Sequence, residues 1–254
     1  MLDAMFDLSG KVALITGGSK GLGKAMARGL VEAGADVIIS SRHENELKSA
    51  RAEILQGTKR RGEYLVADMA KRTDVGKLAS FALEKMGKVD ILVNNAGTNV
   101  PQEVDAITDA EWDRIMEVNL NSVMALTRAL VPQMKPRKWG RVIHISSIMA
   151  FVSNNGRNVY SATKAALVGM ARSSALDLGA FGITVNCIAP GPFLTDLPAS
   201  VLSKEEQDRF AKMTALNRWA DPQELVGAAL LLASDAGSYI TGSTIIVDGG
   251  FTAR

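Results

Sequence analysis

Short, uninterrupted runs of apolar residues recur along the chain and restrict its fold more than any other feature. They span residues 12–15, 37–39, 64–66, 91–93, 142–145, 183–185 and 245–247. Longer segments with helical periodicity separate them; in the first segment, apolar or small residues fall at positions 22, 25, 26, 29, 30 and 33. Apolar runs without alternating polar residues are typical of strands that are covered on both faces, as in a parallel sheet.

The alternation of strands and helices predicts an α/β fold, because short strands joined by helices pack through right-handed crossovers. We expect a single-domain, Rossmann-type, doubly wound parallel sheet of about seven strands with helices on both faces. No linker or repeat divides the chain, so residues 1–254 should form one domain. The segment 190–212 contains Pro190, Pro192 and Pro198, which prevent a continuous helix, and we expect it to form a lid over a site.

The charges exclude one class of partner. The 29 Lys and Arg residues nearly balance the 27 Asp and Glu residues, for a net charge of +2, and the two kinds are interspersed. A nucleic-acid binder usually gathers a cationic excess, so we expect small molecules and copies of the same chain as partners.

Membrane association and secretion are not expected either. The longest apolar block near the C-terminus, 228–233, is far shorter than the ~20 residues of a membrane span. The start of the chain is acidic and has no apolar signal segment. The single cysteine, Cys187, fits a reducing compartment and is expected to be a buried, inert thiol. These features predict a cytoplasmic protein.

A glycine-rich segment follows the first apolar run and opens the first helical segment. Residues 16–23 read TGGSKGLG. At this place an open α/β sheet binds phosphate, because free backbone N–H groups and the helix dipole face the anion. Gly17 would provide the tight turn, Gly21 the close approach of backbone to ligand, and Gly23 the close packing of the helix.

The same segment also fits another motif. G-x-S-x-G is the nucleophile elbow of α/β-hydrolases, with Ser19 as the nucleophile. Such an elbow needs a histidine base, and the chain has only His43, in a turn, and His144, inside an apolar run. Phosphate binding is therefore the favoured interpretation.

The end of the second apolar run bears on the choice of nicotinamide cofactor. An NAD enzyme of this architecture usually carries an acid there, which accepts a hydrogen bond from the ribose 2′-hydroxyl. This chain has Ser41 and Arg42 instead. Arg42 and Lys20 can form a cationic clamp for a 2′-phosphate, with Ser41 donating a hydrogen bond. NADP(H) is the predicted cofactor; use of NAD(H) as well stays open, because Arg42 can equally be a solvated loop charge.

Tyr160 and Lys164 lie four residues apart in a segment of helical character, and so share one helix face. A phenol with a pKa near 10 is a poor base at neutral pH, but a neighbouring ammonium favours the phenolate. The pair predicts acid/base chemistry at Tyr160.

Two polar residues complete a candidate catalytic set. Ser147 follows the fifth apolar run, at the carboxyl edge of the sheet where ligands bind, and its hydroxyl can hold a substrate oxygen. Asn119 falls on a mostly apolar helical stretch. It can order a water beside Lys164, or it can be a hydrogen-bonded packing amide.

These motifs together resemble the short-chain dehydrogenase/reductase family in its form of about 250 residues, and the resemblance runs from Gly10 to the C-terminus. The matching positions are Thr16-Gly17-x-x-x-Gly21-x-Gly23, Asp68, Asn94-Asn95-Ala96-Gly97, Asn119, Ser147, Tyr160-x-x-x-Lys164, Pro190-Gly191 with Thr195, and Asp248-Gly249-Gly250. The segment 6–11 and the Ser41-Arg42 pair are also similar to gluconate 5-dehydrogenase-like members.

The resemblance implies a role for each matching residue. Asn119, Ser147, Tyr160 and Lys164 would be the catalytic tetrad, with a water-mediated proton relay. Lys164 would also bind the nicotinamide ribose, and no metal is implied. The implied cofactor-binding residues are Gly17, Ser19, Lys20, Gly21, Leu22, Gly23, Ser41, Arg42, Asp68, Met69, Asn95, Ala96, Gly97, Tyr160, Lys164, Pro190, Gly191, Phe193 and Thr195.

The expected reaction is reversible hydride transfer between NADP(H) and a ketone or secondary alcohol. A 3-oxoacyl-thioester reductase or general carbonyl reductase is favoured, because residues 193–202 of the lid are mostly apolar. A sugar or sugar-acid dehydrogenase of the gluconate 5-dehydrogenase type is the alternative, and a catalytically silent dinucleotide sensor is a different class. A carrier-protein reductase would need a basic docking patch, for which Arg137 and Lys138 are candidates unless they form a solvated turn. The family resemblance also implies a homotetramer.

Overall fold

The computed structural model describes residues 2–195 and 203–253, in which seven strands form one parallel sheet. The strands are β1 (Val12–Thr16), β2 (Asp36–Ser41), β3 (Gly62–Val66), β4 (Ile91–Asn94), β5 (Gly140–Ile145), β6 (Ile183–Pro190) and β7 (Thr244–Val247). Their order is β3-β2-β1-β4-β5-β6-β7, with every neighbouring pair parallel. Each predicted apolar run lies within one of these strands.

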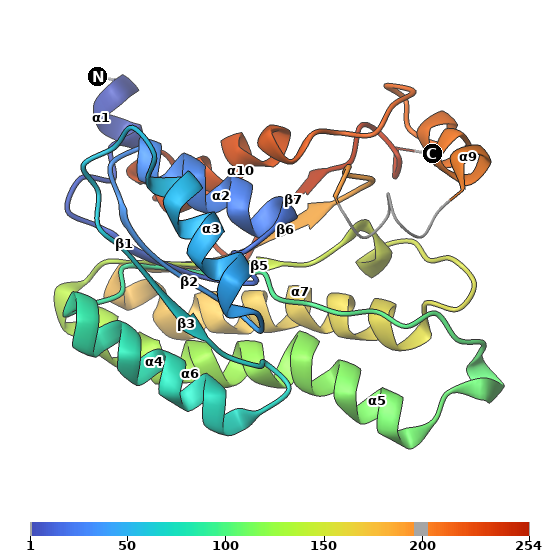
Figure 1. Ribbon diagram of the computed structural model, residues 1–254, viewed down its shortest axis with the longest axis horizontal. Helices are drawn as coiled ribbons and strands as arrows, with labels where there is room; N and C mark the ends of the chain where they lie inside the picture. The colour runs from blue at the N-terminus through green and yellow to red at the C-terminus, as the bar shows by residue number, and fades with distance from the viewer. Residues whose placement is uncertain (1, 196–202, 254) are drawn as a thin grey trace.

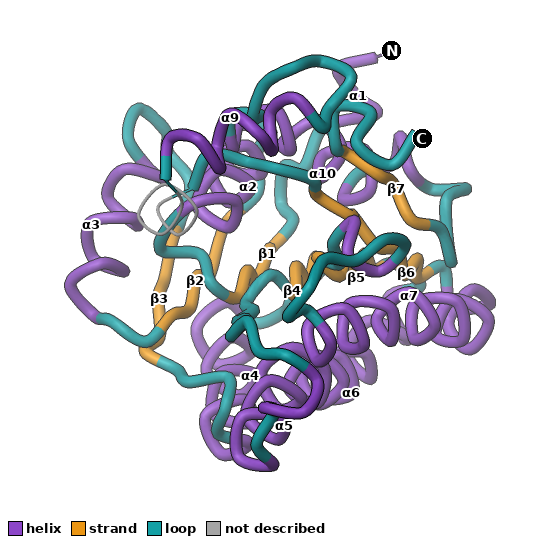
Figure 2. The backbone as a smooth tube through the Cα atoms, turned by 90° about the vertical axis from the view of Figure 1, so that its right-hand side faces the viewer, coloured by secondary structure: helices purple, strands orange, loops and turns teal. Residues whose placement is uncertain are grey.

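Helices cover both faces of the sheet (Figures 1 and 2). The described helices are α1 (Leu2–Phe6), α2 (Gly21–Glu32), α3 (Glu44–Leu55), α4 (Arg72–Met86), α5 (Asp109–Met116), α6 (Ser122–Met134), α7 (Asn158–Leu178), α9 (Lys204–Lys212) and α10 (Val226–Ala233). Residues of α2, α3 and α10 share one buried apolar cluster with the sheet, and residues of α4, α6 and α7 share the other. This arrangement confirms the predicted doubly wound Rossmann-type fold.

The sequence pattern of α2 shows why these helices pack as they do. Met26 and Leu30, two of the predicted apolar positions, are fully buried against the sheet. Val226 packs directly against Gly29 on the same face. A Cβ at Gly29 would lie only 2.2 Å from a Val226 methyl group, so a side chain there would clash. None of the helices in the described part of the chain is both long and apolar enough to cross a lipid bilayer.

The segment 190–212 is more regular than expected at its end. Residues 204–212 form α9, which begins with a capping box between Ser203 and Glu206. The last proline of the segment, Pro198, precedes this cap, so nothing in 204–212 opposes a helix. Residues 196–202, which include most of the apolar lid positions, lie outside the described residues.

The strand order places a crevice at the carboxyl ends of β1 and β4. The chain proceeds outward from β1 toward β2 and β3, and then returns to β4 on the other side of β1. Because the loops after β1 and β4 therefore lead to opposite sides, their ends leave a crevice between them, which is where open α/β sheets bind ligands.

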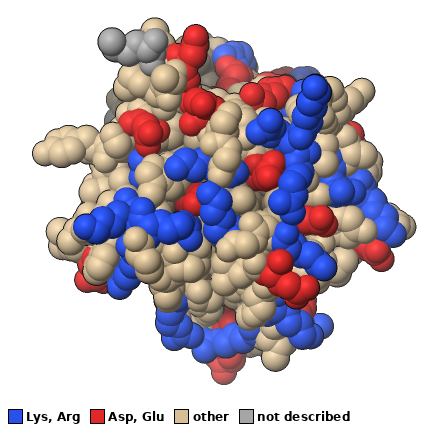
Figure 3. All heavy atoms as spheres, turned by 90° about the vertical axis from the view of Figure 1, so that its left-hand side faces the viewer, with Lys and Arg blue, Asp and Glu red and all other residues tan. Residues whose placement is uncertain are grey.

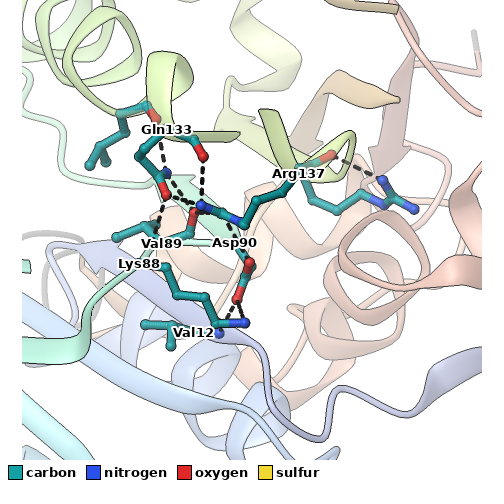
Figure 4. A network of polar contacts seen from close by, with 9 residues as sticks. Val12, Lys88, Val89, Asp90, Gln133 and Arg137 are labelled. Carbon is teal, nitrogen blue, oxygen red and sulfur yellow. Dashed lines mark hydrogen bonds and ion pairs between the residues drawn. The ribbon is translucent and has the colours of Figure 1, made fainter. Parts of the chain in front are cut away.

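A network of polar contacts joins the amino ends of the same two strands (Figure 4). The side chain of Asp90, just before β4, is 3% exposed. One of its oxygens accepts a hydrogen bond from the Val12 N–H at 2.9 Å and lies 3.0 Å from Lys88 Nζ. The other oxygen lies 3.1 Å from the guanidinium of Arg137, which also donates to the Val89 carbonyl. The carboxylate thus fastens β1, β4 and the segment after α6 to one another.

We expect Asp90→Ala to lower the free energy of unfolding by about 3 kcal/mol, because it leaves two cations and one buried N–H without their acceptor. Urea denaturation followed by far-UV circular dichroism measures this loss. The control is Glu84→Gln, since the Glu84 side chain is 73% exposed and pairs with Lys85; this variant should change stability by less than about 0.5 kcal/mol. Equal stability of the two variants would contradict the assignment.

Candidate active site

A cleft of about 640 Å³ lies in the crevice at the carboxyl ends of the strands. It brings together most of the predicted cofactor-binding residues from loops that are far apart in the sequence. Its lining comprises Gly17, Ser19, Lys20, Gly21, Leu22, Gly23, Ser40, Ser41, Arg42, His43, Glu46, Ala67, Asp68, Met69, Ala70, Asn95, Ala96, Gly97, Thr98, Arg114, Val118 and Thr195. The lining therefore runs along the ends of β1 to β4.

The glycine-rich loop presents the N-terminus of α2 to this cleft. Gly17 has a φ of +65°, which a residue with a side chain rarely adopts. A Cβ at Gly23 would lie 2.2 Å from the Gly17 carbonyl oxygen, so this position accepts only glycine without a shift of the backbone. No side chain caps α2 at its first residues. The backbone N–H groups there are available to an anion.

Asn95 fixes the glycine-rich loop from the neighbouring strand. Its side-chain amide donates to the Thr16 carbonyl at 2.9 Å and to the Gly17 carbonyl at 3.1 Å. The Thr16 hydroxyl accepts from the backbone N–H groups of Asn95 and Ala96, both at 3.0 Å. The loops after β1 and β4 are thus joined by four hydrogen bonds. This geometry fits the implied role of Asn95 as a support of the cofactor loop.

Asp68 and Met69 lie where β3 ends, at the far end of the cleft. One oxygen of Asp68 accepts from the Ala70 N–H at 3.0 Å, which holds the carboxylate in a tight turn. Met69 is 5% exposed and also belongs to the apolar cluster beneath the sheet. The two side chains form a polar and an apolar part of one wall.

The predicted cationic clamp is only partly free to meet an anion. Lys20 Nζ lies 2.8 Å from the carboxylate of Glu46, a residue of α3 that also lines the cleft. Arg42 is exposed and, within residues 2–195 and 203–253, has no ion pair. The hydroxyl of Ser41 is buried without a hydrogen-bond partner among the described residues, so it can bind a polar group that enters the cleft.

Tyr160 lies in the first turn of α7, beside Ser147. Burial raises the pKa of its phenol, whereas a hydrogen bond with Ser147 and the positive charge of Arg157 lower it by less. We expected Lys164 to favour the phenolate. The structure shows that burial outweighs these opposing effects. The pKa of Tyr160 is therefore raised, and the phenol keeps its proton.

Lys164 is held one turn further along the same helix. Its side chain is 4% exposed, and Nζ donates to the Ile145 carbonyl at 2.7 Å. The ammonium also lies 5.5 Å from the centre of the Tyr160 ring. Burial lowers the pKa of Lys164 to about 8, so this amine can lose its proton close to neutral pH.

Asn119 is fully buried in a π-helical turn, Glu117–Asn121, between α5 and α6. Its side chain accepts from the Thr98 N–H at 2.8 Å and donates to the Thr98 carbonyl at 2.9 Å and to the Thr163 hydroxyl at 3.2 Å. The amide therefore fastens the loop after β4 to α7, as the packing interpretation predicts. Such π turns are frequent at functional sites, and no sequence signal marked this one.

The other candidate nucleophiles and bases, His144, Cys187 and Ser19, do not form a catalytic pair. Burial lowers the pKa of His144 to about 4, so it is neutral, and its Nδ1 lies 3.1 Å from the Asn94 amide. Burial raises the pKa of Cys187 to about 12, which leaves an inert thiol, as expected. Ser19 donates to Glu46 at 3.4 Å and forms no pair with a histidine, so the geometry does not fit a hydrolase elbow.

The loop after β6 reaches back over the glycine-rich loop. Pro190 ends β6, and Gly191 packs so closely on Asp248 that a Cβ there would lie 2.7 Å from it. Phe193 is 4% exposed and pairs with Ala220, whereas Thr195 lines the cleft beside Gly21. Among the described residues no three His, Cys, Asp or Glu side chains are grouped to hold a metal ion.

Arg137 is not part of a docking patch at the site. Its guanidinium is committed to Asp90 and to the Val89 carbonyl, at the amino ends of the strands and so at the opposite edge of the sheet from the cleft. The alternative of a solvated turn holds for this residue, because Arg137 is exposed in the turn Lys135–Arg137 even though its guanidinium contacts the buried carboxylate of Asp90.

Comparison with known proteins identifies the family. A family model described as Enoyl-(Acyl carrier protein) reductase matches residues 17–252. The chain is 35% identical over 250 residues to gluconate 5-dehydrogenase of Gluconobacter oxydans (strain 621H), covering 98% of this chain and 97% of the relative. The chain belongs to the short-chain dehydrogenase/reductase family. It is thus an oxidoreductase that acts on alcohol groups or the corresponding ketones.

Solved structures of other short-chain dehydrogenases/reductases share the fold closely. A 3-oxoacyl (acyl-carrier-protein) reductase from Agrobacterium tumefaciens C58 with NADP bound superposes with a TM-score of 0.93 at 34% identity, covering 98% of this chain and 97% of that one. A gluconate 5-dehydrogenase from Burkholderia cenocepacia J2315 in complex with NADP and tartrate gives a TM-score of 0.93 at 34% identity, with both chains fully covered.

The buried amine of this dehydrogenase/reductase makes its stability depend on pH. Below pH 8, Lys164 is protonated in both the folded and the unfolded chain, and the cost of burying its charge is fully present. Between about pH 8 and 10.5, the unfolded chain keeps a proton that the folded chain has lost, so stability rises with pH. Relative to Lys164→Met, the wild type should gain up to about 3 kcal/mol across this range.

Urea denaturation at pH 7.5, 9 and 10.5 measures this difference. Lys204→Met is the control, since Lys204 is 83% exposed and should keep the wild-type dependence. If the free energy of unfolding changed with pH in the same way for Lys164→Met and for the wild type, burial would not destabilise the ammonium of Lys164.

Proposed function

We propose that this chain is an NADP(H)-dependent enzyme that transfers hydride reversibly between the nicotinamide and a ketone or secondary alcohol. One observation carries the proposal. Tyr160, Ser147 and the buried ammonium of Lys164 meet at the carboxyl edge of the sheet, where the loops that line the dinucleotide-sized cleft also end. These three side chains, together with Asn119, form the proposed catalytic tetrad.

The cleft fits a dinucleotide through features of this chain. The uncapped N-terminus of α2 and the loop of Gly17 and Gly21 suit a pyrophosphate. The unpaired Ser41 hydroxyl and the exposed Arg42 guanidinium suit a 2′-phosphate, which supports NADP(H), and two similar structures contain NADP. The remaining predicted contacts are Ser19, Lys20, Leu22, Gly23, Asp68, Met69, Asn95, Ala96, Gly97, Tyr160, Lys164, Pro190, Gly191, Phe193 and Thr195.

In reduction, Tyr160 acts as the acid. When bound, the nicotinamide supplies the hydride to the carbonyl carbon. Tyr160 donates its proton to the substrate oxygen as charge develops there, and the Ser147 hydroxyl donates a hydrogen bond to the same oxygen. The raised pKa of Tyr160 suits this direction, because the phenol holds its proton at neutral pH until the substrate oxygen accepts it.

Lys164 restores the proton to Tyr160. Its ammonium lies above the tyrosine ring and stabilises the phenolate that forms after proton donation. With a pKa of about 8, Lys164 can itself pass on a proton at working pH. Asn119 positions this group, because it ties the loop after β4 to Thr163, the residue next to Lys164.

The favoured substrate is a 3-oxoacyl thioester or another ketone with apolar surface. Leu194, in the proposed lid over 190–212, is an apolar side chain that is 48% exposed, and it precedes Thr195, which lines the cleft. A sugar acid is the second candidate substrate. Gluconate 5-dehydrogenase of Gluconobacter oxydans is similar in sequence to this chain, and the similar structure from Burkholderia cenocepacia is a gluconate 5-dehydrogenase with tartrate bound. A steady-state panel of both substrate classes with NADPH separates them, and turnover of any of them rules out a silent sensor.

We also propose that residues 1–254 form a single domain, that the protein acts in the cytoplasm and that it assembles as a homotetramer. Lys and Arg are interspersed with Asp and Glu on the face shown in Figure 3, which favours small molecules over nucleic acid as partners. Light scattering after gel filtration should give the mass of four chains, and a monomer mass would contradict the assembly.

We expect Tyr160→Phe to lower kcat by at least about 10²-fold, because the variant keeps the ring but lacks the proton that the substrate oxygen needs. Affinity for NADP(H) and the thermal midpoint should stay close to those of the wild type. The control is Tyr239→Phe, since Tyr239 is fully exposed and its loss of a hydroxyl should leave kcat unchanged. A Tyr160→Phe variant with near-wild-type turnover would refute the assigned role.

A further inference from the structure

A carboxylate lies among the groups of the cleft that attract an anion. Glu46 is in the first turn of α3, and one of its oxygens lies 2.8 Å from Lys20 Nζ. The other oxygen accepts a hydrogen bond from Ser19 at 3.4 Å. Lys20 and Ser19 belong to the glycine-rich loop, so Glu46 reaches from α3 across to the loop that precedes α2.

This carboxylate is charged at neutral pH. The hydrogen bond from Lys20 lowers the pKa of Glu46 below its usual value, and Ser19 adds to that shift. Glu44 in the same turn differs, because it pairs with Lys48 and Tyr64 and does not line the cleft. A general preference for acids at helix N-termini explains both residues, but only Glu46 brings its charge to the cleft.

The neighbouring groups in the cleft favour the opposite sign. Arg42 has no ion pair within the described ranges 2–195 and 203–253, and the buried Ser41 hydroxyl has no partner there. Both lie with Glu46 and Lys20 on the lining of the same cleft. The subsite therefore combines two cations and a hydroxyl, which suit a phosphate, with one carboxylate, which suits a sugar hydroxyl.

We propose that Glu46 determines cofactor specificity by weakening the preference for the 2′-phosphate that Arg42, Ser41 and Lys20 would otherwise impose. Its charge repels the phosphate and competes with it for Lys20, whereas it can accept a hydrogen bond from a ribose 2′-hydroxyl. The inference rests on the proposed dinucleotide site. It assigns to this chain the use of both NADP(H) and NAD(H), with Glu46 as the group that admits NAD(H).

The geometry explains why the sequence did not show an acid at this subsite. At the end of β2, where an NAD enzyme of this architecture usually carries an acid, this chain has Ser41 and Arg42. Glu46 lies five residues after Ser41, and the first turn of α3 brings it back over the cleft. Its carboxylate thus lines the cleft where it contacts Lys20 and Ser19 of the glycine-rich loop.

Isothermal titration calorimetry of the full-length protein with NADP⁺ and with NAD⁺ tests the proposal. Glu46→Gln keeps the size of the side chain and removes its charge. We expect the Kd of NADP⁺ to fall about tenfold, while the Kd of NAD⁺ stays the same or rises. The ratio of the two constants therefore shifts by at least that factor toward NADP⁺.

Glu53→Gln is the matched control. Glu53 is also on α3 and pairs with a lysine of α2, Lys24, at 2.8 Å, but it does not line this cleft. Its removal should leave the ratio of the two dissociation constants unchanged. Both pairs are partly exposed to solvent, so both variants should melt close to the wild type, which a thermal scan verifies.

Three outcomes would overturn the inference, and they can be distinguished from one another. If the wild type binds both nucleotides and Glu46→Gln leaves the ratio of their constants unchanged, Glu46 does not set the preference and the proposed function stands. If the wild type binds neither nucleotide, the proposed function fails and the inference fails with it. Equal shifts of the ratio in Glu46→Gln and Glu53→Gln would also refute it, since the effect would not belong to the cleft.

Discussion

The hydrogen bonds between Asn95 and the glycine-rich loop fix the position of the loop after β4 relative to the loop after β1. They join the loops after β1 and β4, which the strand order sends to opposite sides of the sheet. On one side this link fixes the turn at Gly17 and hence the N-terminus of α2. On the other it leads directly to Gly97, where a Cβ would lie 3.4 Å from Lys164 Nζ and 3.5 Å from Asn119 Oδ1. A single link therefore relates the glycine-rich loop to the residues proposed to transfer protons.

Burial shifts the pKa values of Lys164 and Tyr160 in opposite directions. It lowers the pKa of the amine and raises that of the phenol, so both groups are shifted toward their neutral forms. A proton that passes from the ammonium of Lys164 to a phenolate at Tyr160 leaves both groups neutral, which is the state that burial favours. The hydrogen bond from Lys164 to the Ile145 carbonyl fixes the amine in place without supplying a negative charge.

The sequence allowed the sheet and the main site residues to be predicted because their signals are local. Seven apolar runs marked the strands, and glycine spacing marked the turn before α2. The pairing of Lys20 with Glu46 could not be predicted, since it depends on the rotation of α3 about its axis. The π turn at Asn119 depends on packing of α5 and α6 against α7, and α9 was missed because the prolines before it obscured the cap at Ser203.

The Asp90 network lies at the amino ends of β1 and β4, whereas the cleft lies at their carboxyl ends. The same two strands thus carry a stabilising network at one end and a candidate binding site at the other. Loops at the carboxyl ends can diversify toward new substrates while the anchor at the other end continues to secure the same pair of strands. In a family whose members share one fold and differ in substrate, such a division lets stability and specificity evolve without constraining each other.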